Sequence, residues 1–172
     1  MSKWETIGAS DEWYTPAFVF DAFGDTFDLD VASPCVKRHV PASCWLTERD
    51  DGLRYAQFWH GFIWMNPPFG GRNSLGPWLD KFFDHGNGIA LTPDRTSAPW
   101  WQDAHERADA FLFTRGKIKF ERPDGSIGGS PGSGVTLWAS GPRGVAALSR
   151  AASLGALCVK HNLSGDEIVS KG

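Results

Sequence analysis

The stretch Gly61-Phe62-Ile63-Trp64-Met65-Asn66-Pro67-Pro68-Phe69 joins a short apolar run to an abrupt stop. Such a run favours a buried β-strand, and two consecutive prolines end it in a rigid turn. Open α/β sheets bind their ligands just beyond the carboxyl ends of their strands. We therefore expect the residues that follow Met65 to carry the function of this chain.

The corner formed by residues 66–69 offers hydrogen-bond acceptors beside a flat ring. The side-chain oxygen of Asn66 and the carbonyl oxygen of Pro67 are enough to accept both hydrogens of an amino group. Proline adds no backbone N–H that would compete with them. Phe69 supplies a face on which a planar base can stack. The alternative is that Pro67 and Pro68 do no more than end a core strand.

Strand-like and helix-like segments alternate on both sides of this corner. Thr15 is predicted to cap a helix that has Pro16 at its first position and ends at Gly24, and a strand follows over 27–31. The other predicted elements are a helix from a cap at Asn73 or Ser74 to Gly86, a strand at 89–91, a helix capped by Thr96 or Ser97, strands at 110–114, 117–120 and 135–140, a helix over 142–154 and a strand at 156–159. Residues 34–58 show no sustained period, and 124–134 read as a loop.

This alternation predicts an α/β fold with a Rossmann-like sheet that is mostly parallel and has helices on its faces. The closely spaced strands after residue 110 predict antiparallel strands at one edge. At 172 residues with 41% hydrophobic content, residues 1–172 suit a single compact domain without a separate target-recognition domain. The chain shows no membrane-spanning run or signal peptide, so we expect a cytoplasmic protein. Three cysteines without a C-x-x-C pair predict no disulfide framework and no metal site.

The overall charge gives no clear indication of the partner. A net charge of −3 and a pI near 5.9 count against nucleic acid, since binders of nucleic acid are often basic. Only the face that meets the phosphates matters, however. The stretch from Arg115 through Lys117 and Lys119 to Arg122 is locally basic, and Arg72 and Arg95 each follow a predicted strand end.

Taken together, these motifs resemble the phage-type (Dam-type) DNA N6-adenine methyltransferases. They follow the family's order over roughly residues 11–140, and they are Trp13-Tyr14-Thr15-Pro16, Leu29-Asp30-Val31-Ala32-Ser33, Asp50-Asp51-Gly52-Leu53, Asn66-Pro67-Pro68-Phe69 and Arg115-Gly116-Lys117-Ile118-Lys119-Phe120. The resemblance implies an S-adenosylmethionine-dependent, site-specific enzyme that methylates the N6 amine of adenine in double-stranded DNA. Since a paired base cannot reach such a pocket, the target is expected to be flipped out of the duplex.

The resemblance also implies roles for individual residues. The amine is gripped by residues 66–69, with Asn66, Pro67, Pro68 and Phe69 as the catalytic set. The cofactor is expected to contact Thr15 and Pro16 at a helix start, Asp30, the backbone of Val31 and Ala32, and one of Asp50 and Asp51, with Asp51 preferred. DNA is expected to contact Arg72, Arg95, Lys117, Lys119 and Phe120. The other interpretations are ordinary helix capping at Thr15, an Asp-Gly turn at Asp51 and a solvated edge strand at 117–120.

Two other functional classes remain open. The same fold serves methyltransferases that act on RNA adenine or on a protein glutamine. A non-catalytic nucleic-acid-binding module with a decayed methyltransferase fold is the second class. With so short a chain, recognition of a DNA sequence is expected to come from loops such as 34–58 and 121–134. We expect a monomer or a weak homodimer.

Overall fold

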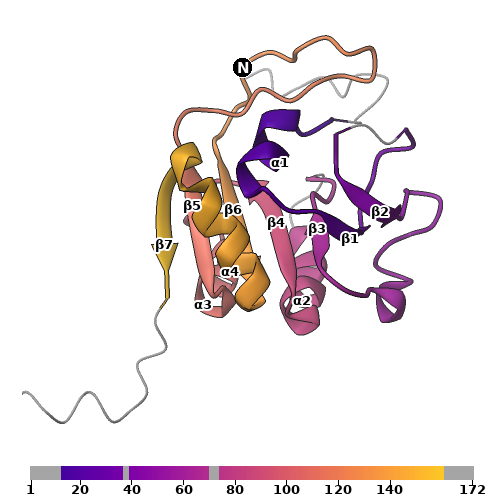
Figure 1. Cartoon of the computed structure of the whole chain (residues 1–172), viewed down its shortest axis with the longest axis horizontal. Coiled ribbons are helices and arrows are strands. Elements are labelled where there is room, and N and C mark those ends of the chain that lie inside the picture. The colour runs from indigo at the N-terminus through magenta and orange to yellow at the C-terminus, as the bar shows by residue number, and fades with distance from the viewer. Residues whose placement is uncertain (1–12, 37–38, 70–73, 161–172) are drawn as a thin grey trace, which may run out of the picture.

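The computed structural model describes residues 13–36, 39–69 and 74–160. Strands and helices alternate along this part of the chain, with two short 3-10 helices, η1 and η2, between them (Figure 1). In chain order the elements are α1 (Ala17–Phe23), β1 (Phe27–Asp30), β2 (Ala42–Trp45), η1 (Ala56–Phe58), β3 (Ile63–Met65), α2 (Leu75–His85), β4 (Gly88–Pro93), α3 (Pro99–Arg107), β5 (Ala110–Thr114), β6 (Val135–Ser140), α4 (Gly141–Arg150), η2 (Ala151–Leu154) and β7 (Gly155–Val159).

The strands form one mixed sheet of seven, in the order β2-β1-β3-β4-β6-β5-β7. The four strands from β2 to β4 pair in parallel, whereas β6 pairs antiparallel with both β4 and β5, and β7 pairs antiparallel with β5. The predicted α/β sheet with antiparallel strands on one side is therefore confirmed. Because β5 points the same way as β4, the chain leaves β1, β3, β4 and β5 at one common edge, which we call the carboxyl edge.

Two helices cover each face of the sheet. Helices α1 and α4 pack with Phe27, Trp64 and Leu137 on one face, and α2 and α3 pack with Met65 and Trp138 on the other. Successive strand residues alternate between these two cores, since side chains in a strand point to opposite faces. The sheet is thus buried between the helix pairs, and ligands can reach it only at its edges.

Several predicted helix boundaries need correction. Pro16, not Thr15, occupies the N-cap of α1, in an extended conformation, and the helix begins one residue later. Likewise Ala98, not Thr96 or Ser97, precedes α3, with Pro99 at the start. At α3 the fixed φ angle of Pro99 suits the first helical position, whereas at α1 the proline lies one residue before the helix. Neither helix start has a side-chain cap hydrogen bond. The alternative cap of α2 at Asn73 lies outside the described residues; Ser74 holds the N-cap position.

The predicted strand at 117–120 does not form. Its residues do alternate, with Ile118 and Phe120 buried and Lys117 and Lys119 exposed, but the segment lies beyond the end of β5 and pairs with no strand of the sheet. Only single bridges follow, from Glu121 to Tyr14 and to Ile127. Alternation indicates that one side of a segment is buried, and here the core that the sheet shares with α1 and α4 buries it. Conversely, β2 forms within the unassigned residues 34–58 at an edge where Ser43, Cys44 and Trp45 are exposed.

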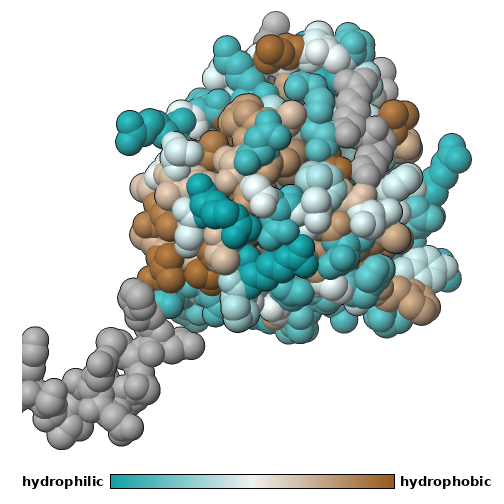
Figure 2. Space-filling view, in the orientation of Figure 1, coloured by the Kyte–Doolittle hydropathy of each residue, from teal (hydrophilic) through white to brown (hydrophobic). Residues whose placement is uncertain are grey.

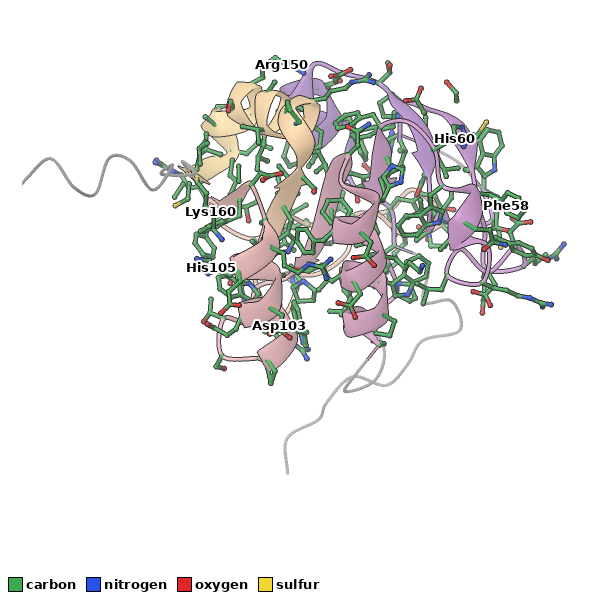
Figure 3. All side chains as sticks on the ribbon, turned by 90° about the horizontal axis from the view of Figure 1, so that it is seen from below. Phe58, His60, Asp103, His105, Arg150 and Lys160 are labelled. Carbon is green, nitrogen blue, oxygen red and sulfur yellow. The ribbon has the colours of Figure 1, made fainter. Side chains whose placement is uncertain are left out.

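At the other end of the strand order, β7 forms the outer edge of the sheet. Edge strand β7 leaves Ala156, Cys158 and Val159 exposed, and apolar residues gather over it in Figure 2. Just after β7, Lys160 donates hydrogen bonds to the carbonyl oxygens of His105 and Glu106, and Figure 3 shows Lys160 and His105 on the same side, away from Phe58 and His60. Within the described ranges, no helix is long and apolar enough to cross a membrane.

Candidate active site

The candidate site begins where β1 and β3 end side by side at the carboxyl edge. Asp30 of β1 pairs with Trp64 of β3 in parallel register. Val31 continues this pairing by donating its backbone N–H to the carbonyl oxygen of Trp64, at 3.1 Å. The two expected functional segments, residues 30–32 and residues 66–69, therefore leave neighbouring strands, as the sequence predicts for parallel strands.

Asn66 is half-buried, and its amide is oriented by a residue far away in sequence. The side-chain nitrogen Nδ2 donates a hydrogen bond to the hydroxyl oxygen Oγ1 of Thr15, at 3.2 Å. No described residue donates to the other end of the amide, the oxygen Oδ1. An amide that is held by its nitrogen presents its oxygen as an acceptor.

The remaining residues of the corner differ in exposure. Pro67 is buried, Pro68 is exposed and Phe69 is half-buried. Phe69 packs against both hydrophobic cores, so its ring bridges the two faces at the end of β3. The corner is therefore anchored in the core but open to solvent at Asn66 and Pro68.

Asp30 lies at the end of β1 with only 2% of its surface exposed. Its Oδ1 accepts a hydrogen bond from the backbone N–H of Ala32, at 3.2 Å. Val31 is completely buried, and Ala32 is half-buried. The Asp30 carboxyl group thus shapes the loop that leaves β1 and places acceptor oxygens beside the carboxyl edge.

The loop at residues 50–53 is packed onto the same strand end. A Cβ on Gly52 would lie 2.1 Å from the carbonyl oxygen of Val31 and 3.0 Å from the ring of Trp78. The carbonyl oxygen of Gly52 also accepts a hydrogen bond from Nε1 of Trp59, at 3.0 Å. This close approach is possible only for glycine, and it places the neighbouring acidic residues near the end of β1.

The two candidate carboxylates of this loop have different local roles. Asp50 accepts hydrogen bonds from the backbone N–H and the hydroxyl of Thr47, both at 2.8 Å. These bonds, the backbone one first, hold the pKa of Asp50 below its ordinary value. Asp51 has a positive φ of 51° and accepts a hydrogen bond from the backbone N–H of Arg54, at 3.2 Å. Both side chains are exposed, so the choice between them remains a prediction.

The segment after β5 lies beside the candidate site, next to Tyr14 and Thr15. Tyr14 and Glu121 exchange two backbone hydrogen bonds, of 2.9 and 3.0 Å, and Oε2 of Glu121 lies 2.8 Å from Nε2 of His39. Tyr14 directly precedes Thr15, which holds Asn66. These contacts bring residues 115–134 next to the Asn66 corner, and Figure 1 shows this segment running beyond the sheet beside α1.

The residues expected to contact DNA fall into three groups. Arg95, Lys117 and Lys119 are exposed and follow β4 or β5 at the carboxyl edge. Phe120 is only 9% exposed and belongs to a hydrophobic core, where its ring anchors the segment instead of facing solvent. Arg72 lies outside the described residues.

Two features of the site escape the sequence pattern. The hydrogen bond between Thr15 and Asn66 joins positions 51 residues apart, and no local sequence pattern predicts it. Asp94, just after β4, has a buried oxygen, Oδ1, without a hydrogen-bond partner. Its position after a predicted strand was a usable signal, because the residues that follow parallel strands meet at one edge. Among the described residues, no three His, Cys, Asp or Glu side chains are grouped to hold a metal ion.

An α/β sheet with an amide, a hydroxyl and carboxylates at the ends of adjacent parallel strands is typical of the class of α/β proteins that bind ligands at this edge. The particular family follows from comparison with known proteins. The family model described as DNA N-6-adenine-methyltransferase (Dam) matches residues 5–137. The chain belongs to this family, which confirms the predicted resemblance and makes it a DNA-directed methyltransferase by descent. No curated protein and no solved structure matches the chain.

Proposed function

We propose that this chain transfers a methyl group from S-adenosylmethionine to the N6 amine of an adenine that is flipped out of double-stranded DNA, at specific sites. Family membership supports the DNA adenine acceptor. The identity of the methyl donor, the flipping of the base and the site specificity are further parts of our proposal. We interpret the sheet as a Rossmann-like methyltransferase sheet, and residues 1–172 as one domain in which loops read the DNA.

The observation that carries the proposal is the orientation of Asn66. Its Nδ2 is held by Thr15 at 3.2 Å, which leaves Oδ1 as an acceptor at the open end of β3. The carbonyl oxygen of Pro67 supplies a second acceptor one residue later. A pair of acceptors at a strand end matches an amino group with two hydrogens.

These acceptors act on the amine, whose lone pair is delocalised into the adenine ring. By accepting the two N6 hydrogens, Asn66 and Pro67 favour the pyramidal nitrogen that develops as the new bond forms. When bound, S-adenosylmethionine supplies a methyl group attached to a positively charged sulfur. On methyl transfer the N6 lone pair would form the new N–C bond while the C–S electron pair stayed with sulfur, and the surplus N6 proton would leave to solvent. Position and electrostatics supply the effect, so no strong general base is required.

The hydrogen-bond acceptors at the carboxyl edge fit such a cofactor. S-adenosylmethionine carries hydroxyl and amino donors, which require carboxylate or carbonyl acceptors. Asp30, Asp51 and the orphaned Oδ1 of Asp94 supply acceptors around the ends of β1 and β4. We assign the cofactor to Asp30, Val31, Ala32 and Asp51.

Thr15 and Pro16 are assigned differently from the sequence prediction. The Thr15 hydroxyl already accepts a hydrogen bond from Asn66. Pro16 has no N–H to donate and precedes a helix of only seven residues. We therefore place Thr15 with the amine-binding residues as a positioning residue, and we do not rely on the start of α1 to hold the cofactor.

The first experiment tests Asn66 directly. Purified wild-type protein and the Asn66→Ala variant are incubated with radiolabelled S-adenosylmethionine and genomic double-stranded DNA, and incorporation into N6-methyladenine is measured. Removing one such acceptor is expected to lower the turnover number about 100- to 1,000-fold. The dissociation constant of the cofactor, measured by calorimetry, should stay within about threefold.

Asn87→Ala is the matched control. Asn87 also donates through Nδ2, to the carbonyl oxygen of Gly61 at 2.9 Å, but it precedes β4 at the opposite edge of the sheet. Its removal should leave turnover unchanged. Unaltered turnover in Asn66→Ala would rule out the proposed grip. If the wild-type protein binds the cofactor but methylates only RNA or protein, the methyl acceptor is not DNA adenine and the proposed substrate is wrong. Binding to DNA without any cofactor binding would favour a non-catalytic module.

A further inference from the structure

Residues 120–128 form a short hairpin that runs from the end of the strand predicted at 117–120 into the loop predicted at 124–134. The backbone N–H of Arg122 donates to the carbonyl oxygen of Ser126, and that of Gly128 donates to the carbonyl oxygen of Phe120, both at 2.8 Å. Between these bonds, Glu121 and Ile127 face each other as an antiparallel bridge. We call residues 120–128 the 120–128 hairpin.

This hairpin lies directly beside the proposed amine-binding corner. Glu121 bridges Tyr14 on one side and Ile127 on the other, so the three residues form a small ladder. Neighbouring strands lie about 4.8 Å apart, which places Ile127 roughly 10 Å from the chain segment that carries Thr15. Thr15 in turn holds Asn66.

The hairpin is packed against Trp13. A Cβ on Gly128 would lie 2.5 Å from the ring of Trp13 and 2.9 Å from the carbonyl oxygen of Phe120. The guanidinium of Arg122 lies over the Trp13 ring, 5.6 Å from its centroid. Asp124 accepts a hydrogen bond from the backbone N–H of Ser126, at 2.8 Å, inside the turn. The outer strand of the hairpin is therefore supported on several sides.

Ile127 projects from this supported strand into solvent. Its exposed fraction of 67% is the highest among the exposed large hydrophobic residues of the described chain. Single exposed apolar residues are common on protein surfaces, so exposure alone indicates nothing. What distinguishes Ile127 is its place, on a packed hairpin next to the candidate site.

The charge around Ile127 points to the kind of partner. Residues 115–134 contain four Lys or Arg residues and two Asp or Glu residues, within a chain whose net charge is −3. Arg115, Lys117, Lys119 and Arg122 are all exposed. An exposed apolar side chain on a segment that carries more cations than anions suits a DNA duplex, because cations meet phosphates and the apolar side chain can enter the base stack.

We propose that Ile127 is the wedge that enters the duplex where the target adenine leaves it, and that it stabilises the flipped-out state. This inference rests on the proposed function and adds to it the residue that separates the base from its neighbours. Phe120 does not perform this task, because its ring is buried. The β-branched side chain of Ile127 is rigid at χ1, which suits a wedge that must hold its shape against stacked bases.

The test compares two duplexes with one target adenine, in a sequence that methylated-base sequencing shows the wild-type protein to modify. In one duplex the adenine is paired with thymine, and in the other it faces an abasic site. Ile127→Ser should lower the methylation rate on the paired duplex at least about tenfold, but by less than about twofold on the abasic duplex, where little unpairing is required. Ile127→Leu should retain most of the rate.

A second readout is independent of methyl transfer. With 2-aminopurine in place of the target adenine, wild-type protein should raise the fluorescence, and Ile127→Ser should abolish most of that rise. Val159→Ser, which changes another exposed β-branched residue on the distant edge strand β7, is the control and should behave as wild type. If Ile127→Ser loses methylation rate equally on both duplexes, or on neither, Ile127 is not a wedge, but the proposed methyltransferase function is unaffected. If sequencing finds no methylated adenine in DNA exposed to the wild-type protein, the result would instead contradict the proposed function.

Discussion

Thr15 and Asn66 show how one hydrogen bond can assign a role to two residues. An isolated asparagine side chain can present either its oxygen or its nitrogen to a ligand. The bond from Nδ2 of Asn66 to Oγ1 of Thr15 removes that choice, because the nitrogen is engaged and the oxygen remains. Since Thr15 is only 4% exposed, water competes little for its hydroxyl.

Replacing Thr15 tests this orienting role. Thr15→Val keeps the shape of the side chain but removes the acceptor, so the Asn66 amide loses its preferred orientation. We expect the turnover number to fall about tenfold, which corresponds to the loss of one hydrogen bond. Cofactor affinity and the melting temperature should change little.

Thr15→Ser retains the hydroxyl and should restore most of the turnover. The measurements are steady-state kinetics on DNA and calorimetric binding of the cofactor. Weakened cofactor binding with normal turnover would assign Thr15 to the cofactor, as the sequence motif first suggested. Equal activity of the Val and Ser variants would show that the hydroxyl has no orienting role.

At the scale of elements, the loop between β2 and β3 makes a close backbone contact with the chain just after β1. Gly52 lies between the carbonyl oxygen of Val31 and the ring of Trp78, on helix α2. Three elements therefore meet at a residue without a side chain. This contact positions Asp51 at the carboxyl edge, so it links the packing of the loop to the proposed cofactor site.

The glycines at 52 and 76 form a matched pair for a stability test. Gly52→Ala places a methyl group 2.1 Å from the Val31 carbonyl oxygen, so backbone must move, and we expect the free energy of unfolding to fall by about 2–3 kcal/mol. Gly76 lies within helix α2, and its added Cβ would meet nothing within 4 Å. Gly76→Ala should leave the free energy of unfolding within about 0.5 kcal/mol of wild type, because Gly76 lies in the first turn of α2 and precedes Pro77, which offsets the gain in helix propensity. Urea unfolding measures both, and an unaffected Gly52→Ala variant would show that the loop does not depend on this contact.

At the scale of the whole molecule, ion pairs tie the first helix to the last. Asp25, just after α1, accepts hydrogen bonds from Arg143 and Arg150 of α4, at 2.8 and 3.0 Å. Arg143 also lies over the ring of Phe62, 4.5 Å from its centroid. The hydrogen bond from Arg143 is the largest cause that lowers the pKa of Asp25. These contacts close the face covered by α1 and α4, at the edge opposite the candidate site.

The lowered pKa predicts how acid affects the fold. Because the pKa of Asp25 is lower in the folded state than the ordinary value near 3.9, its stabilising contribution is complete above about pH 4 and is lost as the pH falls through the folded pKa. We expect Asp25→Asn to lower the free energy of unfolding at pH 7 by about 1 kcal/mol. The variant should also lose less stability than wild type on acidification below pH ~4.

Asp80→Asn is the comparison, because Asp80 is 71% exposed and pairs with Arg107 at the surface. Exposed pairs contribute little, so this variant should follow the wild-type curve. The measurement is the unfolding free energy as a function of pH. A steeper loss of stability in Asp25→Asn than in wild type would contradict the assignment.

Local pattern was sufficient wherever one segment determined its own structure. The proline stop after Met65, the glycines that end α1 and α2 and the alternating runs in β5 and β6 were all readable from neighbouring residues. The order of the motifs also predicted the family. The helix starts at Thr15 and Thr96 were misplaced, because neither helix start has the side-chain cap that the hydroxyls suggest.

Only the tertiary structure decided which distant residues meet. It placed Thr15 against Asn66, buried Phe120 in the core and made residues 120–128 a hairpin that supports Ile127. The physical reason is the distance along the chain over which each kind of interaction acts. Periodicity and turn chemistry act over a few residues and are written locally in the chain. The partner of a side chain 50 or more residues away depends on the strand order, and no local pattern of this chain encodes that order.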